Sequence, residues 1–150
     1  MNNIDDFVKG FVSSWNGFLD DLMQVTTLKL ATKRPRSAYE ENLVPILEKI
    51  VTDLKEDHIT LYATVRTELA ENMASKDALT YLQHEFSFFH ELVTQLNETA
   101  EPDNEDVDNA IEAGETIKGS FEQLIEKLPE RWKKILKVVN EILSLLKIAI

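Results

Sequence analysis

The chain has 150 residues, a length that favours one domain over residues 1–150 with a sizeable hydrophobic core. It contains no cysteine, which excludes disulfides and thiolate metal sites. The formal net charge is -11, and because such an acidic surface repels phosphate backbones, we expect no nucleic-acid partner.

The first predicted helix runs from about Asn3 to Ala31. Apolar residues recur there at alternating spacings of three and four, which is typical of an amphipathic helix. They are Ile4, Val8, Phe11, Trp15, Phe18, Leu22 and Val25. Because Pro35 disfavours helical backbone at the residue before it, the helix should end before Arg34.

A second helix should start at the capping box Ser37-Ala38-Tyr39-Glu40 and continue to about Met73. Pro45 should kink this helix or delay its beginning to about Leu43. The segment is on the order of 50 Å long, against about 36 Å for the helices that follow. It should therefore bend, with Asp57 to Thr60 as the candidate position, or project beyond its neighbours. The shared apolar stripe makes His58 a hydrogen-bonded core or boundary residue.

The third and fourth helices are predicted by two unbroken 3-4-3-4 apolar repeats with an acidic, Pro-containing turn between them. Ser75 is the candidate N-cap of the third helix, from Lys76 to Thr99. The fourth should run from Asp103 or Asn104 to Leu128, because Pro129 cannot continue it without a kink. Together they should form an antiparallel hairpin.

A shorter fifth helix should run from about Glu130 to Ala149, with Pro129 placed suitably for its start. It is amphipathic and basic, so it can pack on its own acidic bundle or lie in a membrane interface. We favour the bundle, because the preceding helix is acidic. The apolar surface is nevertheless wider than one packing seam, which indicates a second contact. The candidate partner-binding residues are Trp132, Leu136, Val138, Leu143, Leu145 and Ile148.

These elements predict an all-α fold, an up-down antiparallel helical bundle with four long helices and a shorter C-terminal helix. In this topology the first and third connections lie at the same end. The first is basic, with Lys33, Arg34 and Arg36, whereas the third is acidic, with Glu98, Glu101, Asp103, Glu105, Asp106 and Asp108. We expect these opposite charges to face each other.

The sequence gives no support for an enzyme. A di-iron bundle needs Glu-x-x-His motifs, but Lys55, Tyr81 and Ser87 precede the three histidines at that spacing. His84 and His90 point about 120° apart on a helix, so we interpret them as surface residues beside an aromatic stripe. A Gly-x-Ser-x-Gly motif and a glycine-rich phosphate loop are also missing. We therefore expect no catalytic residue, no metal and no cofactor.

The favoured hypothesis is a cytoplasmic, non-enzymatic interaction or regulatory module. It would bind a protein partner, or a second copy of itself, through an apolar helix face. The cytoplasmic assignment follows from an N-terminus that lacks a secretory pattern. The first alternative is a peripheral membrane-binding or membrane-perturbing protein that uses the C-terminal helix. The second is a small-ligand-binding bundle, in which Gly114 leaves room for a cavity lined by Trp15, His58, Tyr62, Phe86 and Phe89.

Overall fold

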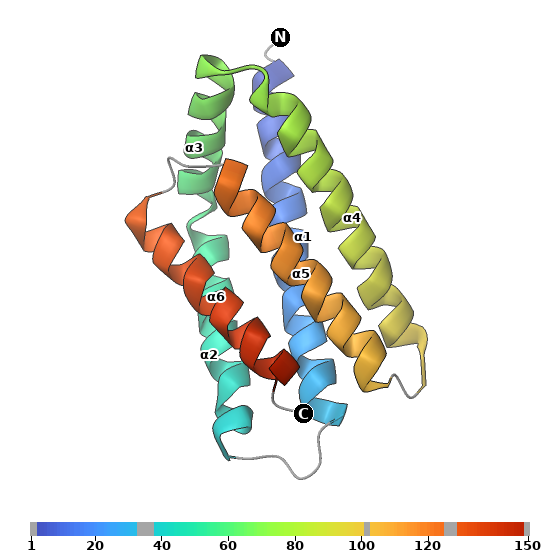
Figure 1. The fold of residues 1–150 in the computed structure, drawn as a ribbon. Coiled ribbons are helices and arrows are strands. Elements are labelled where there is room, and N and C mark those ends of the chain that lie inside the picture. The colour runs from blue at the N-terminus through green and yellow to red at the C-terminus, as the bar shows by residue number, and fades with distance from the viewer. Residues whose placement is uncertain (1–2, 33–37, 101–102, 125–128, 149–150) are drawn as a thin grey trace.

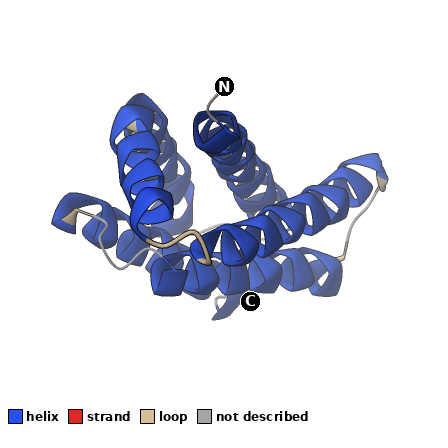
Figure 2. Cartoon of the chain, turned by 90° about the horizontal axis from the view of Figure 1, so that it is seen from above, coloured by secondary structure: helices blue, strands red, loops and turns tan. Residues whose placement is uncertain are grey.

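The computed structural model describes residues 3–32, 38–100, 103–124 and 129–148. The described residues form six helices and no strand (Figures 1 and 2). The helices are α1 (Asn3–Thr32), α2 (Ala38–Glu56), α3 (His58–Glu71), α4 (Ser75–Glu98), α5 (Asn104–Leu124) and α6 (Glu130–Ile148). α2 and α3 together return antiparallel to α1, and α4, α5 and α6 alternate in direction after them (Figure 1). The all-α bundle expected from the apolar spacing is confirmed.

α1 is the central helix, since it contacts each of the other five. Its apolar stripe is buried from Val8 to Val25, as the spacing of three and four predicts. The middle of the core is aromatic. Trp15 stacks on Phe121 with ring centroids 4.4 Å apart, and Phe18 stacks on Phe86 at 5.3 Å. Aromatic side chains from α1, α4, α5 and α6 therefore meet in one cluster.

The long second segment is broken, which is one of the two outcomes that its length predicts. α2 ends at Glu56 and α3 begins at His58, with Asp57 between them. The break corrects the expectation for His58, whose side chain is exposed and whose Nδ1 lies 3.0 Å from the Lys55 carbonyl oxygen. The apolar stripe resumes at Leu61, so the interruption moves only the residue at the joint out of the core.

Of the two outcomes expected for Pro45, the delayed start of the helix is wrong, and the expectation that Ser75 is the N-cap of its helix is also wrong. α2 begins at Ala38 and includes Pro45, so the proline does not delay the beginning of the helix. Ala74, not Ser75, occupies the N-cap of α4 and makes no side-chain cap hydrogen bond. The Ser75 hydroxyl instead donates to a carboxylate oxygen of Glu68 at 3.0 Å. This bond joins α4 to the end of α3, so a tertiary contact replaces the local cap.

α6 packs on the bundle against α5, α2 and α1 (Figure 1). Trp132, Leu136 and Val139 are buried against the core. The indole N–H of Trp132 donates to Asp57 Oδ2 at 2.6 Å, and an Arg131 guanidinium nitrogen lies 3.7 Å from the same oxygen. Asp57, the residue between α2 and α3, thus anchors the start of α6 through these two polar contacts.

The end of α1 and the beginning of α2 lie at the same end of the bundle as the end of α4 and the beginning of α5, as the up-down topology predicts (Figure 1). Lys33, Arg34, Arg36 and Glu101 lie outside the described residues. The charge contact described at this end joins Asp108 of α5 to Lys29, whose ammonium nitrogen is 2.6 Å from Asp108 Oδ1. Lys29 is fully buried, so this interhelical ion pair forms inside the bundle end.

Candidate functional site

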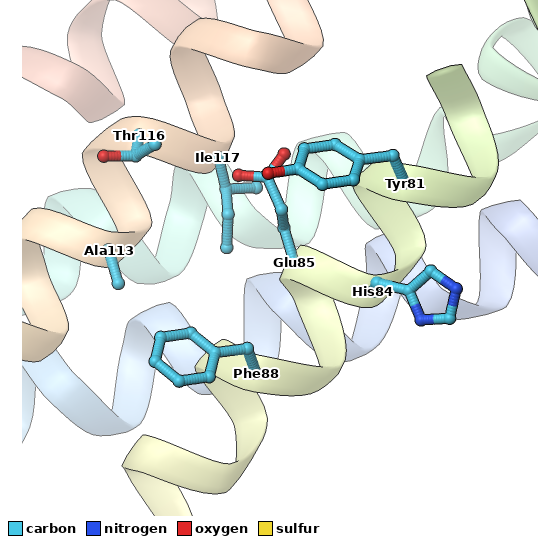
Figure 3. Close-up of a pocket in the computed structure, with 7 residues that line it drawn as sticks. All are labelled: Tyr81, His84, Glu85, Phe88, Ala113, Thr116 and Ile117. Atoms are coloured by element: carbon cyan, nitrogen blue, oxygen red, sulfur yellow. The ribbon is translucent and has the colours of Figure 1, made fainter. Parts of the chain in front are cut away.

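The candidate site is a groove of about 390 Å³ between α4 and α5 (Figure 3). Four of the lining residues come from α4 and three from α5. They are Tyr81, His84, Glu85, Phe88, Ala113, Thr116 and Ile117. Tyr81 is 66% exposed and Phe88 is 58% exposed, which is unusual for two aromatic side chains on one helix. The groove therefore presents aromatic surface to the outside.

The groove follows from the sizes of the side chains on the flank of α5 that faces α4. Ala113, Thr116 and Ser120 recur there at spacings of three and four, and all three are small. They do not fill the space beside the apolar seam. Next to them, the backbone of Gly114 is crowded: a Cβ there would meet Leu22 Cδ2 at 3.3 Å and Phe89 Cε1 at 3.5 Å. Gly114 thus admits bulky neighbours from α1 and α4, and does not open a central cavity.

Glu85 supplies the charge of the groove. Its Oε1 is shielded from solvent and has no hydrogen-bond partner among the residues that the structure describes. Burial raises the pKa of the Glu85 carboxyl above its ordinary value, and a hydrogen bond from the Ser120 hydroxyl acts in the opposite direction. None of the seven lining residues is a lysine or an arginine. One oxygen of the carboxyl group is therefore shielded from solvent, and no lysine or arginine among the lining residues pairs with the group.

Figure 3 shows how the side chains are directed. The side chains of Tyr81 and Glu85 extend from α4 towards Thr116 and Ile117 on α5, whereas the imidazole of His84 points away from them. Phe88 lies one turn further along α4, facing Ala113. The groove thus has an aromatic ring on either side of a single carboxyl group, at positions i, i+4 and i+7 of one helix.

A second, smaller hollow of about 190 Å³ lies further along the seam of the same two helices. Leu92, Gln95, Leu96 and Thr99 of α4 and the adjacent cap line it, with Asp106 and Asn109 of α5. The spacing from Phe88 to Leu92 to Gln95 places these residues on one side of α4. The open face between α4 and α5 therefore continues for several helical turns.

The residues that the sequence predicts for partner binding differ in their exposure. Trp132 and Leu136 are each 1% exposed and belong to the core. Val138 is 38% exposed and lies on the outer side of α6. The side chains of Leu143, Leu145 and Ile148 lie outside the described residues. The part of this surface that is described is thus used mainly to dock α6.

The residues predicted to line a ligand cavity contribute to neither of the two hollows described above. Trp15, Phe86 and Phe89 pack within the aromatic cluster, and His58 is exposed. The Tyr62 hydroxyl donates to Asp5 Oδ1 at 3.0 Å, and Arg66 Nε donates to the same oxygen at 2.5 Å. These contacts tie α3 to the beginning of α1.

The histidines give no metal constellation. His84 and His90 are both exposed, as expected for residues beside an aromatic stripe. His90 Nδ1 lies 3.2 Å from both carboxylate oxygens of Asp21, and burial raises the pKa of that carboxyl group. Within residues 3–32, 38–100, 103–124 and 129–148, no three metal-ligating side chains come together.

Sequence reasoning missed Tyr81, Glu85 and Phe88 as candidate site residues. Tyr81 and Phe88 are seven residues apart and lie off the core stripe of α4, which predicts two exposed aromatic rings on one face. The small residues of α5 at matching spacing are the second pattern. Either pattern alone describes a solvated helix face, and only the pairing of α4 with α5 brings them together.

None of the described helices is both long and apolar enough to cross a membrane. Comparison of the chain with models of protein families, with curated proteins and with solved structures finds no match. The functional argument therefore depends on the groove and on its chemistry.

Proposed function

We propose that this protein is a non-enzymatic helical interaction module that binds a protein partner through the groove between α4 and α5. The observation that supports this proposal is the pair of exposed aromatic side chains, Tyr81 and Phe88, beside a groove of about 390 Å³. Grooves between two helices accept an amphipathic helix, whose apolar residues at i, i+3, i+4 and i+7 fill them. Aromatic side chains also contribute disproportionately to the binding energy of protein interfaces.

A partner other than a second copy is favoured by charge. Each chain carries a formal net charge of -11, so two copies repel each other on average at long range. The groove itself contributes Glu85 to the contact, and a second groove would bring another carboxyl group against it. A self-associating interface at this face would have to overcome both effects.

The proposal is tested by selecting displayed helical peptides, randomised on one face, for binding to the full chain. Selected peptides should lose at least tenfold in affinity for the double variant Tyr81→Gln, Phe88→Gln. The matched control is Ile59→Gln, which removes another strongly exposed apolar residue, on α3. That control should change the affinity less than twofold. Circular dichroism and the unfolding midpoint verify that each variant is folded.

Two outcomes would contradict the proposal. One is that the peptides bind the double variant and the wild type equally well, which would place their site elsewhere. The other is that no peptide is selected while sedimentation shows dimers whose dissociation constant rises in the double variant. In that case the groove would be a contact between copies of this chain.

A further inference from the structure

We infer that the partner is an amphipathic helix that places an arginine side chain against Glu85, between the rings of Tyr81 and Phe88. This inference rests on the proposed function and specifies the chemistry of the partner. It makes the groove a site for a basic residue within an otherwise apolar helix face. Three observations support it: the Glu85 carboxyl oxygen that lacks a hydrogen-bond partner among the described residues, the flanking rings and the charge of the chain.

The carboxyl group of Glu85 requires a cation more than an apolar group. Its Oε1 is removed from water and lacks a hydrogen-bond partner among the described residues, and a buried polar atom in that state costs free energy. A purely apolar partner would cover the remaining part of Glu85 and increase this cost. A guanidinium group would instead pair with the carboxylate, in the geometry that gives two parallel hydrogen bonds.

The rings on either side of Glu85 favour the same group. Tyr81 and Phe88 are exposed, so their faces are accessible to a planar cation. Guanidinium groups stack on aromatic rings and gain cation–π energy when they are partly desolvated. Because most of the Tyr81 side chain is free of neighbours, its ring can change rotamer to let a partner reach the carboxyl group.

The overall charge supports a basic partner as well. The formal net charge of -11 attracts cationic segments and raises their association rate at low ionic strength. Seven residues of helix, the separation of Tyr81 and Phe88, span about 10 Å. A partner helix of two to three turns therefore covers both rings with one basic residue between two apolar ones. The smaller hollow along the same seam allows a longer contact.

The experiment uses the full chain and a display library of helical peptides in which the groove-facing positions are fully randomised. We expect the selected sequences to carry arginine at one central position with apolar residues a turn away on each side. Replacing that arginine by glutamine should weaken binding at least tenfold. Glu85→Gln should weaken binding of the arginine peptide by a similar factor. The two changes together should reduce the affinity little more than either change alone.

Glu91→Gln is the matched control, since it removes one negative charge from an exposed position of the same helix. It should change the affinity less than twofold, so that a loss limited to Glu85→Gln reports a local contact and not the net charge. Glu85→Gln keeps the size of the side chain and removes a desolvated charge, so it should fold; its unfolding midpoint verifies this.

The outcomes separate this inference from the proposed function. If the selected peptides lack a basic residue, or if Glu85→Gln and Glu91→Gln have equal effects, the inference is overturned. The proposed function stands in that case, provided that binding still depends on Tyr81 and Phe88. If binding is independent of these two rings, both the proposed function and the inference fail.

Discussion

At the scale of single residues, two buried tryptophans differ in one hydrogen bond. Trp15 and Trp132 are both within the aromatic cluster, with ring centroids 6.1 Å apart. The Trp132 N–H donates to Asp57, whereas the Trp15 N–H has no partner among the described residues. Both indoles are essentially inaccessible to solvent, so the two positions differ mainly in how the polar atom is satisfied.

We expect Trp132→Phe to cost more stability than Trp15→Phe. Each substitution removes ring volume from the core, but Trp132→Phe also removes a hydrogen bond to a carboxylate, worth roughly 1.5–3 kcal/mol. Trp15→Phe removes an unsatisfied donor, which offsets part of its packing loss. Urea denaturation of both variants measures the difference. An equal or larger loss for Trp15→Phe would show that the contact with Asp57 does not contribute to stability.

The glycines of α5 give a second matched pair. A Cβ at Gly119 would meet no other atom within 4 Å, whereas a Cβ at Gly114 would meet Leu22 and Phe89. Gly119→Ala should therefore stabilise the protein by about 0.5–1 kcal/mol through helix propensity. Gly114→Ala should gain less or become destabilising, since Leu22 must move. Thermal unfolding of the two variants tests this, and an equal gain at both positions would contradict the packing argument.

At the scale of elements, the interruption between α2 and α3 is stabilised by the residue at the break. Asp57 Oδ1 accepts from the Thr60 hydroxyl at 2.7 Å, and its Oδ2 accepts from Trp132. These two hydrogen bonds, the one from Thr60 first, hold the pKa of the Asp57 carboxyl below its ordinary value. The same side chain thus accepts a side-chain hydrogen bond from the first turn of α3 and anchors α6, so the break contributes to the packing of a third helix.

The lowered pKa of Asp57 fixes the sign of a pH dependence. A carboxyl group with a depressed pKa in the folded state contributes stability above its unfolded pKa, near 3.8, and loses it as the pH falls through the folded value. Thr60→Val removes the larger of the two causes. It should cost about 1 kcal/mol at pH 7, and this difference from the wild type should shrink as the pH is lowered below 4.

Denaturation of the two proteins between pH 7 and pH 3 measures this change. Thr64→Val is the control, because the Thr64 hydroxyl donates to the neutral carbonyl of Thr60 at 2.8 Å. Its cost should stay constant over the same range. A cost of Thr60→Val that is independent of pH would refute the assignment of the lowered pKa to this hydrogen bond.

At the scale of the whole molecule, an interhelical ion pair joins the end of α1 to the beginning of α5. Lys29 is fully buried and Asp108 is 18% exposed at its side chain, so the pair is poorly screened by solvent. Its position matches the end of the bundle where opposite charges were expected to meet. The basic partner is, however, a residue of α1 itself.

Asp108→Asn should destabilise the protein by about 3 kcal/mol, the lower limit for breaking a buried ion pair, because Asp108 is partly exposed. The control is Asp20→Asn, which breaks an ion pair between α1 and α2 whose side chains are 58% and 36% exposed. We expect that change to cost about 0–1 kcal/mol. Chemical denaturation at two salt concentrations checks both values, and similar costs for the two variants would disprove the role of burial.

The periodicity of apolar residues was sufficient to predict the all-α class and the central stripe of α1, while prolines and capping residues predicted the limits of most helices. Side chains that recur every three or four residues must be buried together, and this requirement is local to each helix. The length of the segment from Ser37 to Met73 also predicted either a bend, with Asp57 to Thr60 as its candidate position, or a projection beyond the neighbouring helices. These features depend only on the identity and spacing of residues along the chain.

Only the tertiary structure decided which surfaces stay open. The exposed rings of Tyr81 and Phe88 and the small flank of α5 are ordinary features of separate helices, and they form a groove because α4 and α5 pack side by side. Conversely, Trp132 and Leu136 are apolar enough for an interface but are covered by the bundle. Exposure depends on which helices become neighbours, and the apolar pattern of a single helix does not contain that information.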